Sequence, residues 1–310
     1  MEERIEIMNL LQNKQILQHE LQSLVYGSIE IRENNSNKYI YVHYREDGVS
    51  LTKYIGEYSD ELYNLILNNS IKAKKLKKQI TEITKKLKQF NYTEEDLSEK
   101  VEENIDFAKR HLVDTIYKQA ILEGVATTFA DTESIIEGGK VNNMTAEDIL
   151  KIVNLKHAWE FILSKNVILS DTNFALLCEI NKVVEEGFYY TAGRVRNTPV
   201  TIGGTTWIPS LPIESVIKEE LEEIFSKKLT DVDRSIELLL YIMKKQIFID
   251  GNKRTAVIYS NHYLISKGKG IIVIPSELTE EFKTLLIRYY EGKDEKNIKN
   301  FIKEKCYIAI

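Results

Sequence analysis

A long run of mostly apolar residues, spaced alternately four and three apart, is the strongest constraint on the N-terminal part of the chain. The run extends from Leu62 to Phe90 and contains neither proline nor glycine. Such a heptad pattern keeps one side of a helix against a partner helix along its whole length. We therefore predict a helix over residues 60–90, capped by Ser59, that packs lengthwise on another helix. The positions concerned are Leu62, Ile66, Asn69, Ala73, Leu76, Ile80, Ile83, Leu87 and Phe90.

The obvious partner is a first helix over residues 2–25, where apolar side chains recur at helical spacing until Gly27. Three β-type runs, SIEIRE, KYIYVHYRE and VSLTKYIG, follow it and are separated by the turn sequences NNSN and EDG. Residues 1–91 are thus predicted to form a helical hairpin carrying a small β-meander. The heptad positions also allow pairing between two chains, so a homodimer stays open.

Residues 92–310 are predicted to form a second, larger helical domain. The whole chain has only 4 prolines and 14 glycines, which lets long helices continue without interruption. The exception is 193–209, GRVRNTPVTIGGTTWIP, where β-branched residues flank a Gly-Gly turn and indicate a β-hairpin. The predicted fold class is mainly α. Helices are expected from near Tyr92 to Leu122 and at 145–164, 171–186, 211–227, 231–245, 251–266, 276–291 and 295–305.

The composition is that of a globular protein in a reducing compartment. The net charge of −5 gives no overall nucleic-acid footprint. The lysines between 72 and 78 are typical of a solvated face, although an acidic or nucleic-acid partner for residues 1–90 is not excluded. Two distant cysteines suggest no disulfide framework. The acidic start MEERIEIMNLL is unlike a signal peptide, and no apolar run approaches the length of a membrane span, so we expect a cytoplasmic protein.

The segment Gln246-Ile-Phe-Ile-Asp250-Gly251-Asn252-Lys253-Arg254-Thr255 concentrates the chemistry between two predicted helices. A glycine lets the backbone approach a ligand, and the start of the next helix presents unpaired N–H groups suited to phosphates. An arginine adds a forked phosphate contact, and a carboxylate is a preferred ligand of Mg²⁺. The residues alone also fit a polar turn in which Asp250 caps a helix.

This segment resembles the Fic/Doc signature, His-x-Phe-x-Asp-Gly-Asn-x-Arg, at every position except the first. The likeness extends over roughly residues 105–305 and is closest to multidomain Fic proteins. It implies binding of ATP and Mg²⁺, with Asp250 as the metal ligand and Asn252 and Arg254 on the phosphates. The implied nucleotide-binding set is Gly251, Asn252, Lys253, Arg254 and Thr255.

The resemblance also assigns the segment around 193–209 to the family's flap, which aligns a target peptide by adding it as a strand. The implied target-binding residues are Val200, Thr201, Ile202, Gly203 and Gly204.

Two departures from the family pattern concern catalysis. Gln246 stands where the family has the histidine that takes a proton from the target hydroxyl, and an amide accepts no proton near neutral pH. Val257 stands where AMP-transferring members often have a second arginine.

A helix upstream of the core ends in Gln119-Ala-Ile-Leu-Glu123-Gly124, which resembles the inhibitory motif of many Fic proteins. By this resemblance Glu123 and Gly124 form an inhibitory element. Because the usual ion-pair partner is replaced by Val257, we expect Glu123 to lack its partner. A plain helix end is the alternative.

The resemblance implies a protein adenylyltransferase that attaches AMP to a Ser, Thr or Tyr hydroxyl of another protein. The Gln246 substitution leaves two alternatives open. One is a phosphotransferase like Doc, and the other is an inactive regulator that binds nucleotide.

Overall fold

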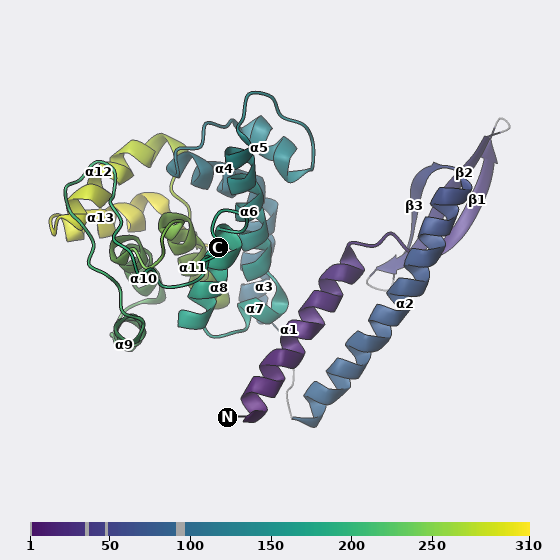
Figure 1. The fold of residues 1–310 in the computed structure, drawn as a ribbon, viewed down its shortest axis with the longest axis horizontal. Helices are drawn as coiled ribbons and strands as arrows, with labels where there is room; N and C mark the ends of the chain where they lie inside the picture. Colours follow the sequence, from purple (N-terminus) through teal and green to yellow (C-terminus); the bar gives the residue numbers. More distant parts are fainter. Residues whose placement is uncertain (1, 35–36, 47–48, 91–96) are drawn as a thin grey trace. The chain divides into compact units, whose positions relative to one another are not determined.

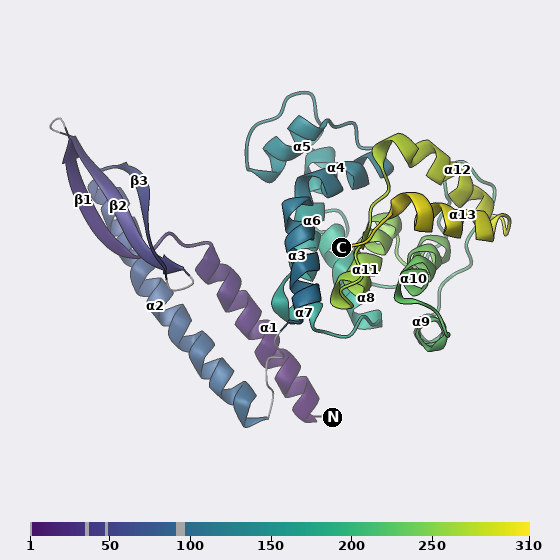
Figure 2. The ribbon, with the colours of Figure 1, turned by 180° about the vertical axis from the view of Figure 1, so that it is seen from behind.

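The computed structural model describes residues 2–34, 37–46, 49–90 and 97–310. The chain forms two compact units, Met1–Glu95 and Asp96–Ile310. Figures 1 and 2 show the elements of each unit from opposite sides. The boundary predicted between residues 91 and 92 lies outside the described residues.

The predicted helical hairpin is formed by α1 (Glu2–Gln22) and α2 (Asp60–Gln89), which run side by side. Ser59 caps α2 by accepting a hydrogen bond from the Leu62 amide. Lys72 of α2 pairs with Glu20 of α1 at 2.7 Å. The heptad positions form the buried or half-buried side of α2, as the spacing predicts. The pairing occurs within one chain, and the possible homodimer stays a prediction.

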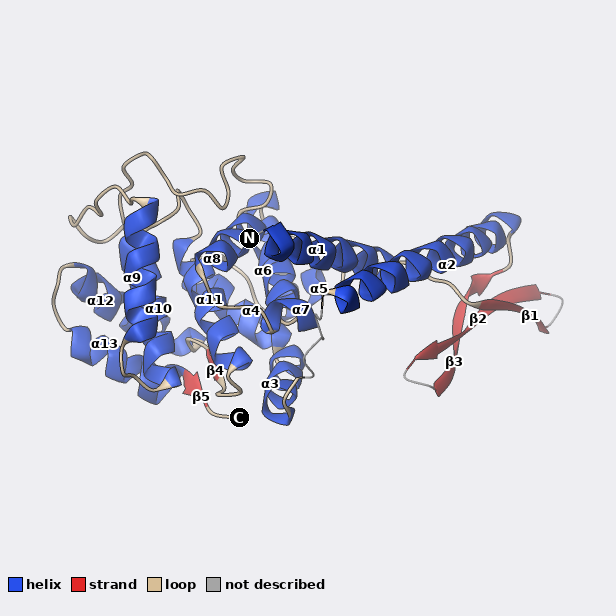
Figure 3. Cartoon of the chain, turned by 90° about the horizontal axis from the view of Figure 1, so that it is seen from below, coloured by secondary structure: helices blue, strands red, loops and turns tan. Residues whose placement is uncertain are grey.

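The predicted meander is an antiparallel sheet of β1 (Ser28–Asn34), β2 (Asn37–Glu46) and β3 (Val49–Glu57), in that order. One face packs on α2, where Ile40 and Val42 are buried with Ile66. The side chains of β2 alternate, so Tyr41 lies on the other face, 5.4 Å from the ring of Tyr54. Figure 3 shows these strands as the largest sheet of the drawing.

The larger unit is built around α11 (Asn252–Ser266), which contacts α10, α8, α6 and α3. Nearly all of its residues are buried, polar ones included, as expected for a helix surrounded by others. The remaining helices are α3 (Glu99–Arg110), α4 (Leu112–Leu122), α5 (Phe129–Ile136), α6 (Ala146–Ile162), α7 (Lys165–Ile168), α8 (Phe174–Val184), α9 (Glu214–Ser226), α10 (Asp231–Lys245), α12 (Thr279–Tyr290) and α13 (Glu295–Phe301).

Several elements differ from the prediction. The helix expected up to Leu122 is broken at His111, whose ring Nδ1 lies 2.9 Å from the Phe107 carbonyl oxygen. The short helices α5 and α7 were not predicted. A two-stranded sheet of β4 (Ile271–Ile272) and β5 (Tyr307–Ile308) was also missed, because two-residue strands carry no periodic pattern.

The segment 193–209 turns back at Gly203 and Gly204 as expected, but it contains no strand, so the prediction of a β-hairpin was wrong there. Arg196 explains the difference. Its buried guanidinium donates hydrogen bonds to the carbonyl oxygens of Thr198 at 2.8 Å and Ser210 at 2.7 Å. A side chain therefore joins the two ends of the flap where a ladder of backbone hydrogen bonds was expected.

Within the ranges that the structure describes, no helix is long and apolar enough to cross a membrane. Cys178 and Cys306 are both free thiols. Burial raises the pKa of each thiol to about 12.

Candidate active site in the loop between α10 and α11

The loop that joins α10 to α11 is fixed by two left-handed residues and one asparagine. Gln246 ends α10 at φ 49°, and Gly251 precedes α11 at φ 71°. Asn252, the first residue of α11, reaches back across the loop. Its side chain accepts a hydrogen bond from the Phe248 amide at 2.9 Å and donates one to the Phe248 carbonyl at 2.8 Å. Asn252, which the resemblance places on the phosphates, here uses its amide to hold the loop.

Asn181 of α8 supports the loop from behind. Its Nδ2 donates to the Asp250 carbonyl and to Thr255 Oγ1, both at 3.1 Å. Its Oδ1 accepts from the Gly193 amide at 2.9 Å, so one side chain connects the loop, α11 and the start of the flap. Thr255, expected to bind nucleotide, is buried and turned towards α8.

The N-terminus of α11 has the properties of an anion site. No side chain caps it. The first backbone N–H of α11 that donates a helical hydrogen bond is that of Thr255, which donates to the Gly251 carbonyl at 2.8 Å. The N–H groups before it have no helical acceptor, and the helix dipole adds partial positive charge at this end. Gly251 itself carries no side chain over these groups, and the Glu185 carboxylate lies against its Cα.

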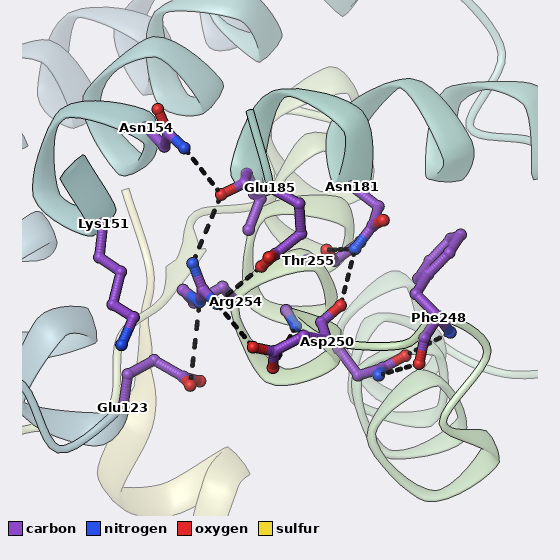
Figure 4. Close-up of polar contacts among 12 residues, drawn as sticks. Glu123, Lys151, Asn154, Asn181, Glu185, Phe248, Asp250, Arg254 and Thr255 are labelled. Carbon is purple, nitrogen blue, oxygen red and sulfur yellow. Dashed lines mark hydrogen bonds and ion pairs between the residues drawn. The ribbon is translucent and has the colours of Figure 1, made fainter. Parts of the chain in front are cut away.

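Arg254 lies at the centre of the site and is 1% exposed (Figure 4). Its Nη2 is 2.7 Å from Glu185 Oε1 and 3.9 Å from Asp250 Oδ2. Its Nη1 donates to the Val184 carbonyl at the end of α8 at 3.4 Å. The arginine is thus held by a carboxylate and by the negative end of a helix.

Glu123 also faces this arginine, from the end of α4. Its Oε2 lies 3.8 Å from Arg254 Nε and 3.7 Å from Lys253 Nζ. Glu123 thus lacks the second arginine, as the valine at 257 implies, but it has two other cations as ion-pair partners, which were not anticipated from the sequence. Val257, at that position, is buried against α4 and the chain after α11.

Gln119 fixes the end of α4 against the loop. Its Nε2 donates to the Arg254 carbonyl at 3.0 Å. Its Oε1 accepts from Trp159 Nε1 at 3.0 Å. Gly124 follows at φ 81° and ends the helix one residue after Glu123. The turn at Gly124 therefore both ends α4 and positions the Glu123 carboxylate.

Several buried charged groups of the site lack hydrogen-bond partners, and the pKa of one of them is raised. Burial, with the nearby charges of Asp250 and Glu123, raises the pKa of Glu185 to about 7, and Arg254 opposes this rise. Both Glu185 oxygens, Glu123 Oε1 and Arg254 Nε have no hydrogen-bond partner, although all are buried. The 2.7 Å contact between Glu185 and Arg254 is thus an ion pair without hydrogen-bond geometry. Buried polar groups usually have hydrogen-bond partners, so these atoms mark a part of the core where the polar groups are poorly satisfied.

Gln246 is tied to the surrounding backbone and to Asn252. Its side chain donates to the Met243 carbonyl at 2.6 Å and accepts from Asn252 Nδ2 at 3.2 Å. Its own carbonyl accepts a hydrogen bond from Arg196 Nε. Asp250, in contrast, is exposed over 53% of its side chain and uses Oδ1 only for the adjacent Gly251 amide.

The flap is anchored at its far end to α12. Trp207 stacks on Tyr290 with ring centroids 5.6 Å apart, and Thr205 donates to Glu291 at 3.1 Å. The turn at Gly203 and Gly204 lies against Ile287 of α12, which leaves room for no side chain at 204. Of the predicted target-binding residues, Thr201, Gly203 and Gly204 are exposed, whereas Val200 and Ile202 are half-buried.

Three residues of this arrangement were not predicted: Asn181, Arg196 and Glu185. Glu185 had a usable signal, because Glu185-Glu186-Gly187 repeats the helix ending of Glu123-Gly124. Gly124 and Gly187 both adopt a left-handed conformation, at φ 81° and 80°. Both helices have a glutamate at the C-cap near Arg254 and a left-handed glycine soon after it, one residue later after α4 and two residues later after α8.

A glycine is needed at position 251 for two reasons: its backbone is left-handed, and the Glu185 side chain lies against it. A Cβ at this position would lie 2.3 Å from Glu185 Oε1. We expect Gly251→Ala to lower the free energy of unfolding by about 3 kcal/mol or more, since it adds left-handed strain and displaces a buried ion pair. The control is Gly292→Ala, at φ 79° with nothing within 4 Å, which has the strain alone. Equal losses in chemical denaturation would show that the contact with Glu185 is unimportant.

Glu185 should make stability depend on pH. An unfolded glutamate titrates near pH 4.3, whereas the folded pKa is raised to about 7. The folded state therefore holds an extra proton in this window, and its stability falls as pH rises through it. Relative to Glu185→Gln, the wild type should lose about 1–3 kcal/mol between pH 5 and pH 8, as measured by urea unfolding. The exposed neighbour, in Glu186→Gln, should show no such change, and a constant difference for Glu185→Gln would contradict the shift.

The geometry can be compared with known proteins. A family model described as the Fic/DOC family matches residues 171–264. None of the curated proteins compared with the chain matches it.

Solved structures share the fold at low sequence identity. A Fic domain containing signaling protein from Bacteroides thetaiotaomicron is 18% identical with TM-score 0.53, covering 68% of this chain and 87% of that one. Fic-1 (aa134–508) from C. elegans is 16% identical with TM-score 0.52, covering 78% and 79%. A Fic family protein from Desulfovibrio desulfuricans is 13% identical with TM-score 0.52, covering 66% and 69%.

The match spans α8, the flap, α9, α10 and most of α11, and thus includes the loop and its Asn181 and Glu185 supports. Residues 171–264 are therefore a Fic/DOC family domain.

Proposed function

We propose that this protein transfers AMP from ATP to the hydroxyl of a Ser, Thr or Tyr side chain of another protein. The observation that carries the proposal is the N-terminus of α11, which no side chain caps, with the buried guanidinium of Arg254 beside it. Fic domains are generally transferases that use ATP with Mg²⁺, and this site has the groups that polyphosphate binding requires.

The residues present fit a phosphate and a metal ion. Arg254 Nε is buried without a hydrogen-bond partner, which leaves it a donor for a phosphate oxygen. Lys253 adds a second positive charge at the start of α11. Asp250 offers an exposed carboxylate, and Mg²⁺ commonly uses one or two carboxylates together with phosphate oxygens. A bound Mg²⁺ would withdraw charge from the phosphates.

The proposed reaction forms a bond between the target hydroxyl oxygen and the α-phosphorus of ATP. The bond from that phosphorus to the α,β-bridging oxygen breaks, and pyrophosphate leaves. The hydroxyl proton needs an acceptor, which the amide of Gln246 cannot be. Positioning and electrostatic stabilisation by α11 and Arg254 remain, so we propose a slow transfer in which water takes the proton.

Two other functions fit the same site. A phosphotransferase like Doc would bind ATP in the reverse direction and move the γ-phosphate. An inactive regulator would bind ATP without transfer, and Gln246 favours it. Incubation of protein substrates with ATP labelled at the α or γ phosphate separates the three. We expect the protein substrate to take up label from the α-phosphate. Label from the γ-phosphate would support the phosphotransferase, and no label would support the inactive regulator.

Glu123 competes with ATP phosphates for the two cations that it faces. Glu123→Gln should therefore tighten binding of ATP with Mg²⁺ roughly tenfold, because a charged hydrogen bond contributes about 1.5–3 kcal/mol. Isothermal titration calorimetry measures this directly. Lys253→Ala should weaken binding in the same experiment.

The matched control for charge is Glu160→Gln, which removes one exposed carboxylate from α6 without contact to Arg254. It should leave the ATP affinity unchanged. Unchanged affinity in Glu123→Gln as well would rule out the competition.

Restoring the histidine should help catalysis more than any other single change. Histidine is among the residues enriched at positive φ, so residue 246 can accept it at φ 49° with little backbone cost. Gln246→His should raise AMP transfer, to itself or to a target protein, by up to ~10²–10⁴. Incorporation of α-labelled ATP measures the rate.

Gln246→Ala serves as the control, since it loses the side-chain contacts to Met243 and Asn252 without gaining a base. If Gln246→His stays inactive while calorimetry still shows ATP binding, adenylyl transfer is the wrong function and the regulator is favoured.

A further inference from the structure

The N-terminal unit contains a groove of about 820 Å³, a volume typical of ligand sites. It lies where α1 ends, between α2 and the adjoining ends of β2 and β3. The chain from Leu21 to Ser28 forms its base, Val42 to Tyr44 with Lys53 form one wall, and Ser70 to Lys77 of α2 form the other. All of these residues belong to one compact unit.

Apolar side chains form part of the lining of the groove, next to serines, one histidine and two tyrosines. Leu21, Leu24, Val42 and Ala73 line it together with Val25, which is 39% exposed. A peptide with apolar side chains would bury surface here that the chain itself leaves in contact with water.

The rim of the groove carries only positive charge. Lys53, Lys74 and Lys77 line it, and no lining residue is acidic. Lys77 lies 4.7 Å from the centroid of the Tyr26 ring. In the parts of the chain that the structure describes, none of the three lysines has a carboxylate within ion-pair distance. The neighbouring Lys72, which does not line the groove, forms an ion pair with Glu20 at 2.7 Å.

The surrounding stretch of α2 increases this asymmetry. Residues 72–88 contain eight lysines and one acidic residue, Glu82. The groove therefore lies beside a locally positive stretch of α2, which attracts an anionic segment and favours its approach.

We propose that this groove binds an acidic segment of a partner protein, with apolar side chains in the depression and carboxylates on Lys53, Lys74 and Lys77. Nucleic acid fits less well. Lys77 already lies over the Tyr26 ring on which a base would stack, and the aliphatic side chains of Leu21, Leu24 and Val25 match apolar side chains of a peptide better than flat nucleobases. The proposal is independent of the reaction at Arg254 and stands whether or not AMP is transferred.

The test uses the full chain and fluorescence anisotropy of labelled probes. The main probe is a short peptide of alternating glutamate and leucine. A glutamate and serine peptide lacks the apolar part, and a lysine and leucine peptide reverses the charge. A thymidine oligonucleotide tests nucleic acid. We expect only the first probe to bind, more weakly as salt rises.

The key variant is Lys53→Ala combined with Lys74→Ala. It should weaken binding of the glutamate and leucine peptide by roughly threefold to tenfold, as two exposed charge contacts imply. The matched control is Lys75→Ala with Lys78→Ala, which removes two exposed lysines of α2 that do not line the groove. Val25→Ser removes apolar surface from the groove and should also weaken binding.

Each other outcome contradicts the proposal. Equal weakening by both lysine pairs would mean non-specific attraction by the charge of α2. Binding of the oligonucleotide that is lost in Lys53→Ala with Lys74→Ala would assign the groove to nucleic acid. A dimer in sedimentation that the same variant dissociates would assign it to a second copy of this chain. Absence of peptide binding would refute the proposal.

Discussion

The larger unit depends on a positive charge that is almost completely removed from water. Arg254 is 1% exposed, and a buried charge is tolerated only where other groups compensate it. Here α4 and α8 end near the guanidinium, so two negative helix ends and the carboxylates of Glu123 and Glu185 surround it. The arrangement explains why residue 251 has no side chain and why Gln119 anchors the end of α4 to the Arg254 backbone.

Elements with a strong local pattern were predictable from the sequence. The 4,3 spacing of α2 specifies which residues face α1, because seam positions depend only on helical geometry. The three strands of the meander follow from alternation and turn residues in the same way. The loop from Gln246 to Arg254 was predictable for another reason. A glycine and polar residues between two apolar helical runs indicate a turn that leads into a helix, without contributions from distant segments, while phosphate binding there stays a prediction.

Contacts between distant residues were not predictable from a local pattern. Arg196 and Gln246 are 50 residues apart, and Asn181 and Thr255 are 74 apart, so neither pair leaves a periodic signal. The flap has the β-branched sequence typical of strands, but hydrogen bonds from the Arg196 guanidinium, not strand pairing, join its ends. Glu123 ends a helix as predicted and lacks the second arginine, but its contacts with Lys253 and Arg254 come from a distant segment and left no local signal.

Arg196 has a consequence for how the domain responds to its target. One guanidinium holds both ends of the flap and the backbone carbonyl of residue 246. A protein that docks on the flap and shifts its ends also changes the support of residue 246. Thermodynamic linkage then requires reciprocity: a ligand that fixes the conformation of residue 246 changes the affinity of the flap for its target by the same factor. Under the proposed function, docking of a target on the flap and the conformation of residue 246 would thus be coupled through the Arg196 side chain.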